Sequence, residues 1–176
     1  MQVRKLTMAA LFAALTAVFS QIAIPTPWMV PVNLATLAVF LSGAVLGARW
    51  GAAAQLAYLA LGLCGVPVFS GFRGGVQVLA GPTGGYLIGY VAAALLVGVL
   101  AHKLHGKAVL PFAMAAGLAL CYAFGTAWFM ASTGSGLMRA LALCVVPYLI
   151  GDALKIAAAA LVAPRLSALL LQEHTV

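Results

Sequence analysis

The chain of 176 residues contains two acidic residues, and only one of them lies in an apolar segment. Glu173 belongs to a polar C-terminal tail, whereas Asp152 lies in a long apolar run with Lys155 three residues further on. On a helix, residues at i and i+3 share one face with a rise of about 4.5 Å between them, so these two side chains can form an ion pair.

This charged pair is costly in a membrane helix, where each charge at the helix centre costs about 2.5 to 3.5 kcal/mol and pairing removes only part of that cost. The remaining cost favours a functional use, and we expect Asp152 and Lys155 to form a polar ligand site between helices. The alternative is an ion pair that only holds its helix against the neighbouring helices.

The composition is that of an integral membrane protein. Hydrophobic residues make up 65% of the chain and charged residues 6%, against roughly one quarter charged residues in soluble domains. At about 20 residues per crossing, the length allows five or six helices in one bundle within the lipid bilayer. We therefore expect an all-α, polytopic membrane protein in which residues 1–176 form a single transmembrane domain of six helices that contains the ligand site.

Apolar runs separated by proline, glycine or polar residues define the six expected helices. They cover approximately residues 6–24, 34–46, 51–63, 84–101, 109–131 and 147–171. The second and third runs are shorter than a full crossing, which predicts tilted helices or helices that border a cavity. A further short helix at the surface is expected at residues 137–146.

The distribution of positive charge predicts the topology. Six crossings place both termini on one side, and that side carries Arg4, Lys5, Arg49, Lys103, Lys107 and Arg165. Only Arg73 and Arg139 fall on the other side, so the positive-inside rule predicts that both termini are cytoplasmic. The formal charge of +7 mainly reflects this asymmetry, and nucleic acid is not an expected partner.

Catalytic and metal-binding patterns are not evident beside Asp152. The three histidines, His102, His105 and His174, all fall in segments predicted to be cytoplasmic. His102 and His105 have a spacing that some metal sites use, but no third ligand is near, so we expect neither a metal nor a cofactor. The chain has no Walker A motif, so uphill transport would require a partner ATPase. We expect a protein that is not an enzyme.

A second candidate region is the small-residue corner GPTGGYLIGY at residues 81–90, which follows an irregular section rich in glycine and proline. This region is expected to shape the wall or mouth of the ligand pocket; the alternative is a close-packed turn without ligand contact. Its candidate ligand-binding residues are Arg73, Gln77, Thr83, Tyr86 and Tyr90. The aromatic residues expected instead at the membrane–water interface are Trp28, Trp128 and Tyr148.

Rows of small residues on the first helix predict a docking face for a partner helix. Ala9, Ala13 and Ala17 are spaced four residues apart, and Ala10 and Ala14 form an adjacent row. Such rows allow another helix to approach closely. The alternative is packing of these alanines inside the chain.

Four stretches carry a resemblance to a known family when they are read in order along the chain. They are LSGAVLGARWG at residues 41–51, GVPVFSGFRGG at 65–75, GPTGGYLIGY at 81–90 and PYLIGDALK at 147–155. Over nearly its whole length the chain resembles the BioY family, the biotin-specific substrate-binding subunits, or S components, of energy-coupling factor (ECF) transporters.

This resemblance implies a six-helix protein of the bacterial cell membrane that captures biotin from outside. It implies a transmembrane coupling subunit and two ATP-binding subunits as partners, with the alanine rows of the first helix facing the coupling subunit. The chain departs from the expected family pattern at Asn33-Leu34-Ala35, where a polar Thr-Leu-Gln is expected. The contribution of the second helix to the site is therefore left open.

Biotin presents a ureido ring with N–H donors and a carbonyl acceptor, and a valerate tail that ends in a carboxylate. Asp152 can accept from the ring N–H and Lys155 can donate to the ring carbonyl, in which case Arg73 or Arg139 would meet the carboxylate. In the alternative arrangement Lys155 meets the carboxylate and Asp152 alone contacts the ring. Three alternative functions remain besides biotin capture. The protein could bind another vitamin, form a passive solute channel or act as an intramembrane enzyme.

Overall fold

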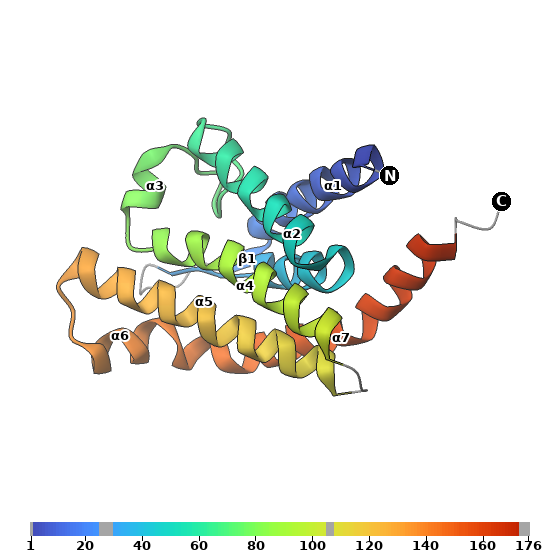
Figure 1. Cartoon of the computed structure of the whole chain (residues 1–176). Coiled ribbons are helices and arrows are strands. Elements are labelled where there is room, and N and C mark those ends of the chain that lie inside the picture. Colours follow the sequence, from blue (N-terminus) through green and yellow to red (C-terminus); the bar gives the residue numbers. More distant parts are fainter. Residues whose placement is uncertain (1, 25–29, 105–107, 173–176) are drawn as a thin grey trace.

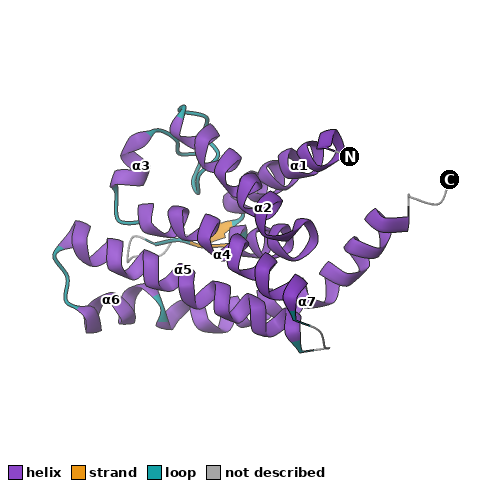
Figure 2. Cartoon of the chain, in the orientation of Figure 1, coloured by secondary structure: helices purple, strands orange, loops and turns teal. Residues whose placement is uncertain are grey.

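The computed structural model describes residues 2–24, 30–104 and 108–172, and these are almost entirely helical (Figures 1 and 2). The helices are α1 (Gln2–Gln21), α2 (Ala35–Leu63), α3 (Val76–Ala80), α4 (Gly84–Lys103), α5 (Val109–Thr133), α6 (Leu137–Cys144) and α7 (Leu149–Gln172), with a 3-10 turn at Val146–Tyr148. Two short antiparallel strands, β1 (Ala23–Ile24) and β2 (Val32–Asn33), follow α1. Within the described ranges, five helical segments are long and apolar enough to cross a membrane, and the protein is an all-α membrane protein as predicted.

Helix α2 consists of two halves that fold back on each other at Gly47. The backbone of Gly47 has φ 79° and ψ 175°, a conformation that side chains disfavour and that a glycine adopts without penalty. Beyond this turn, Gln55 Nε2 donates to Ser42 Oγ at 3.0 Å, although residues 13 positions apart would be about 20 Å apart on a straight helix. The second and third predicted helices are therefore the two halves of a helical hairpin, which accounts for five long helices where six crossings were expected.

Glycines allow this hairpin to pack closely on α4. A Cβ atom on Gly43 would lie 2.4 Å from the carbonyl oxygen of Ala94, and one on Gly98 would lie 2.3 Å from the amide nitrogen of Ala48. Both gaps are too short for a side chain, so the backbones of α2 and α4 are in direct contact at these points. Any side chain larger than hydrogen at Gly43 or Gly98 would force the two helices apart.

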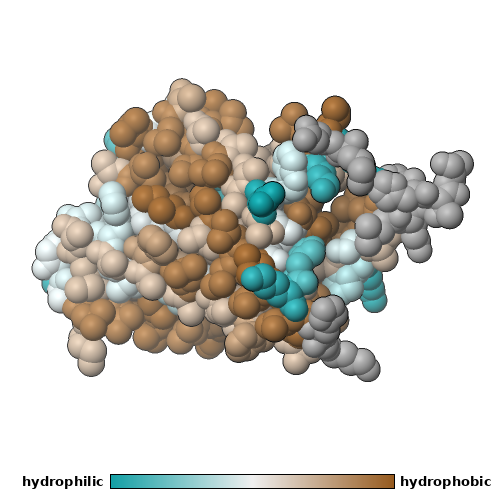
Figure 3. Space-filling model, in the orientation of Figure 1, coloured by the Kyte–Doolittle hydropathy of each residue, from teal (hydrophilic) through white to brown (hydrophobic). Residues whose placement is uncertain are grey.

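Helix α1 begins and α7 ends on the same side of the molecule, which agrees with the predicted topology (Figure 1). The guanidinium of Arg4 donates to the carbonyl of Leu170, which links the start of α1 to the end of α7. Helix α7 changes direction in its C-terminal part, and Pro164 lies within it and removes a backbone hydrogen bond. Figure 3 shows an apolar surface over most of the visible face, with hydrophilic residues gathered towards this end.

The alanine rows of α1 do not share one environment. Ala9 and Ala13 are 4% and 2% exposed and pack in the core of this chain, and Ala17 is half-buried against the same core. Ala10 and Ala14, on the adjacent row, are exposed. Ala9 and Ala13 are thus occupied by intramolecular packing, the alternative considered above, and the exposed row carries the docking prediction.

Candidate ligand-binding site

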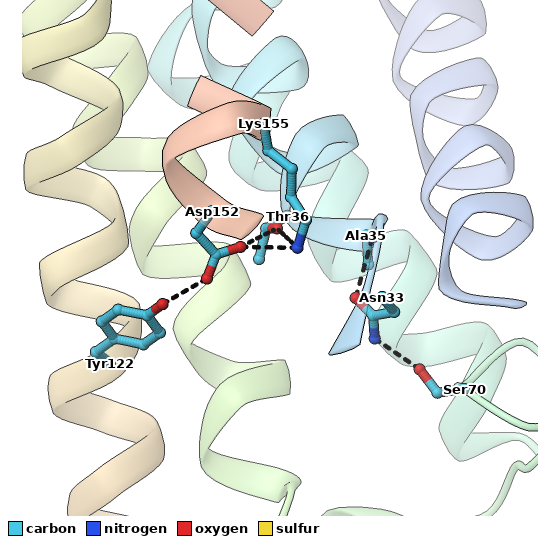
Figure 4. A network of polar contacts seen from close by, with 7 residues as sticks. All are labelled: Asn33, Ala35, Thr36, Ser70, Tyr122, Asp152 and Lys155. Atoms are coloured by element: carbon cyan, nitrogen blue, oxygen red, sulfur yellow. Dashed lines mark hydrogen bonds and ion pairs between the residues drawn. The ribbon is translucent and has the colours of Figure 1, made fainter. Parts of the chain in front are cut away.

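The predicted ion pair is confirmed in the first turns of α7. Lys155 Nζ lies 2.7 Å from Asp152 Oδ1, and the two residues are only 9% and 3% exposed (Figure 4). Asp152 lies in the first turn of its helix, where the partial positive charge of the helix N-terminus favours a carboxylate. The pair is therefore a buried charged centre in a mainly apolar bundle.

Two residues from other helices complete this polar centre. Thr36 at the start of α2 donates through Oγ1 to Asp152 Oδ1 at 3.3 Å and accepts from Lys155 Nζ at 3.2 Å. Tyr122 on α5 donates its hydroxyl to the other carboxylate oxygen, Asp152 Oδ2, at 2.5 Å. Helices α2, α5 and α7 are thereby joined at one point, and their side chains converge there (Figure 4).

The hydrogen-bonding capacity of the pair is not exhausted by these contacts. A carboxylate can accept about four hydrogen bonds and an ammonium donates three. Asp152 accepts from Lys155, Thr36 and Tyr122, and Lys155 donates to Asp152 and Thr36. One acceptor position on Asp152 and one donor position on Lys155 therefore remain, which suits a neutral ligand group that presents both an N–H and a C=O.

A cavity opens next to the ion pair. Its empty space, counted together with the solvent at its open mouth, is about 710 Å³. The walls are mainly aromatic and aliphatic, and they include Tyr58, Phe69, Tyr86, Leu87, Tyr90, Leu118, Tyr122 and Tyr148. A largely apolar chamber with one buried ion pair combines binding area with a group that fixes orientation.

The structure brings most of the predicted site residues to this cavity. Arg73, Thr83, Tyr86 and Tyr90 line it together with Asp152 and Lys155. Arg73 is exposed, and its Nε donates to the carbonyl of Ser70 at 3.0 Å. Their contact with a ligand remains a prediction, but these residues, far apart in sequence, share one cavity.

Two predicted residues lie elsewhere. Gln77 is exposed and donates through Nε2 to the carbonyl of Gly74 at 2.7 Å, in a groove that adjoins the cavity. Arg139 is exposed on α6 and does not belong to the cavity wall. Of the two arginines considered for a ligand carboxylate, the cavity therefore includes Arg73.

Tyr86 forms a wall that depends on a neighbouring glycine. Its hydroxyl donates to the carbonyl of Cys144 at 3.0 Å, which joins α4 to the end of α6. A Cβ atom on Gly125 of α5 would lie 2.3 Å from carbon atoms of the Tyr86 ring. The absence of a side chain at position 125 thus makes room for this aromatic wall.

Tyr148 also belongs to the cavity wall, so its assignment to the membrane–water interface was wrong. It is buried, and its hydroxyl donates to the carbonyl of Val30. Trp128 is partly exposed and donates to the carbonyl of Gly81 at 3.0 Å, whereas Trp28 lies outside the described residues. A tyrosine can lie at the membrane–water interface or in the protein interior if its hydroxyl has a hydrogen-bond partner. For Tyr148 the carbonyl of Val30 is such a partner in the interior.

The start of the second helix contributes to the site despite its departure from the family pattern. Asn33 lines the cavity, donates through Nδ2 to Ser70 Oγ at 2.7 Å and accepts from the amide of Ala35 at 3.1 Å (Figure 4). It therefore fixes both the start of α2 and the loop that carries Arg73. Thr36, one turn further on, contacts the ion pair directly.

Comparisons with known proteins agree with this architecture. The BioY family model matches residues 1–172. A biotin transporter BioY from Thermotoga maritima is 40% identical, over 94% of this chain and 97% of its own length. A biotin transporter BioY from Rhodobacter capsulatus is 36% identical, over 91% of each chain.

A solved structure gives the same result at the level of the fold. The crystal structure of the S component for biotin from an ECF-type ABC transporter superposes with a TM-score of 0.87 and 25% identity. The match covers 94% of this chain and 91% of that one. From the family match over nearly the whole sequence and the shared fold, we conclude that the chain belongs to the BioY family.

Proposed function

We propose that this protein captures biotin with high affinity and takes it up across the bacterial cell membrane as the substrate-specific subunit of an ECF-type ABC transporter. The observation that carries the proposal is the buried Asp152–Lys155 pair facing a mainly apolar and aromatic cavity, in a chain that is 40% identical to a biotin transporter. The role of this protein is to bind and transport biotin, and we assign no catalytic step to the protein.

The orientation that we propose for biotin is based on the positions of the charged residues. The ureido ring meets the buried pair, with Asp152 accepting from a ring N–H and Lys155 donating to the ring carbonyl. The valerate tail runs along the aromatic walls, and its carboxylate meets Arg73, which lines the cavity and is exposed. In the opposite orientation Lys155 would meet the carboxylate and leave Asp152 alone on the ring.

Calorimetry on the detergent-solubilised chain tests the proposal against a second candidate, an S component for another vitamin. We expect one biotin to bind per chain with a Kd below about 1 μM, and thiamine and riboflavin not to compete. Absence of binding at micromolar biotin, with the protein shown to be folded, would sink the proposal. Binding of another vitamin in its place would support the second candidate.

The partners are a transmembrane coupling subunit and two ATP-binding subunits. We assign the contact with the coupling subunit to the exposed Ala10–Ala14 row of α1, where small side chains permit close helix approach. We predict that Ala10→Trp or Ala14→Trp leaves biotin affinity within about twofold but abolishes co-purification with the coupling subunit. Leu11→Trp, at an exposed position that is already large, is the matched control and should retain the complex. Unchanged co-purification of the alanine variants would indicate that this row faces lipid and not the coupling subunit.

Both termini are assigned to the cytoplasm, because cations gather at the end of the bundle where α1 begins and α7 ends. A reporter enzyme that works only in the cytoplasm, fused after Val176, is expected to be active. A periplasmic or extracellular reporter at the same position is expected to be silent. The reverse pattern would place the mouth of the cavity on the cytoplasmic side and contradict capture from outside.

A further inference from the structure

A second hollow adjoins the mouth of the ligand cavity. This outer groove holds about 1060 Å³ of space that is open to solvent, and Gln77, Gly81 and Pro82 belong to its lining. Arg73, Val78 and Thr83 line both the groove and the cavity, so the two hollows meet at these three residues. The groove lies beside α3, at the end of the molecule away from both termini (Figure 1).

The polar character of the two hollows changes from the inside outwards. The inner cavity is lined by Asp152 and Lys155, which are almost fully buried. The outer groove instead carries Arg73 and the amide of Gln77, both of them exposed. If the ring of a ligand contacts the buried pair, its tail therefore lies where the inner cavity meets the outer groove, and a longer tail can extend into the polar groove.

The charge on the tail contributes little to affinity in this arrangement. An exposed arginine paired with a carboxylate is worth at most about fivefold in a binding constant, because water solvates both groups well. Charge-assisted hydrogen bonds to the buried pair are much stronger contributions. Arg73 is exposed, so the ring contacts dominate and the tail carboxylate can be replaced at small cost.

We propose that the site also accepts biotin whose carboxylate is joined through an amide to an amine, as in Nε-biotinyl-lysine. The ring lies on the Asp152–Lys155 pair, and the extension passes Arg73 into the outer groove, where Gln77 meets its polar groups. This inference rests on the proposed function and widens its substrate class from the free acid to its amides.

Competition calorimetry with biotin, biotin N-methylamide and Nε-biotinyl-lysine tests the inference on the detergent-solubilised chain. Both amides are expected to compete with biotin and to bind within about tenfold of its Kd, because only the exposed contact at Arg73 changes. A loss of more than tenfold for either amide, while biotin itself binds, would overturn the inference and leave biotin capture intact. If biotin does not bind to the folded chain, the proposed function fails first.

A variant that fills the outer groove tests whether the extension of the amide ligand lies in this groove or leaves the cavity by another path. Gln77→Trp narrows the outer groove, and we expect it to weaken Nε-biotinyl-lysine at least tenfold more than it weakens biotin. Met138→Trp, at an exposed position of α6 outside both hollows, is the matched control and should leave the ratio of the two affinities unchanged. An equal effect of Gln77→Trp on both ligands would contradict the path through the groove.

Discussion

The double variant Asp152→Asn with Lys155→Gln is expected to fold and to lose about 30-fold or more in affinity for biotin. The substitutions keep side chains of similar size that can still form hydrogen bonds, but remove both charges together. Hydrogen bonds to charged groups are roughly twice as strong as neutral ones, so two weakened contacts cost about 2 kcal/mol, or ~30-fold. Calorimetry with biotin and a thermal unfolding curve of the same sample give the two readouts.

The double change is preferred because a single change confounds two effects. Removing one partner of a buried pair leaves the other charge uncompensated and typically costs about 3 to 5 kcal/mol of stability. Asp152→Ala, for example, would leave Lys155 buried at 9% exposure without its carboxylate partner. A folded double variant with unchanged biotin affinity would show that the pair only holds α7 against α2 and α5.

Gly125→Ala is expected to destabilise the protein by about 1 to 3 kcal/mol and to weaken biotin binding at the same time. The new methyl group would lie 2.3 Å from the ring of Tyr86, so the ring has to leave its place in the cavity wall. Overpacking of this size in a closely packed interior typically costs that much. Thermal unfolding and biotin titration of the purified variant measure the two effects.

Gly151→Ala is the matched control for this prediction. A Cβ atom at Gly151 would meet no other atom within 4 Å, and alanine is favoured over glycine inside a helix. We therefore expect unchanged biotin affinity and a stability equal to or slightly above that of the natural chain. If Gly125→Ala behaves like Gly151→Ala, Tyr86 does not form the wall that we describe.

Much of the fold could be predicted from the sequence because the helices are marked by long apolar runs and by the residues that interrupt them. The fourth helix, for example, was expected at residues 84–101 and is found at Gly84–Lys103. The hairpin in α2 was less accessible. Two short runs separated by Gly47 indicate a break, but the direction of the chain after the break depends on packing against α4.

The site was only partly predictable because its residues come from distant parts of the chain. Asp152 and Lys155 were found because a local spacing of three residues makes their pairing evident on any helix. Thr36 and Tyr122 lie 116 and 30 positions from Asp152, and neither carries a charge that would be costly in a membrane. Their part in the site follows from tertiary packing, which a single sequence does not record.

Burial of individual small or aromatic residues was also beyond a reading of the sequence. Ala13 and Ala14 are neighbours of the same type, yet one packs in the core and the other is exposed. In a soluble helix, polar residues would mark the exposed face, but in a membrane helix lipid and core both favour apolar side chains. The same ambiguity led to the wrong assignment of Tyr148.

Native mass spectrometry of the purified chain, before and after addition of equimolar biotin, tests biotin capture most directly. The proposed function predicts a species heavier than the chain by the mass of one biotin, which persists at activation energies that remove detergent. In the Asp152→Asn, Lys155→Gln variant this species should be strongly reduced. A folded natural chain that shows no such species, or that retains a ligand of another mass which biotin does not displace, would contradict the proposal.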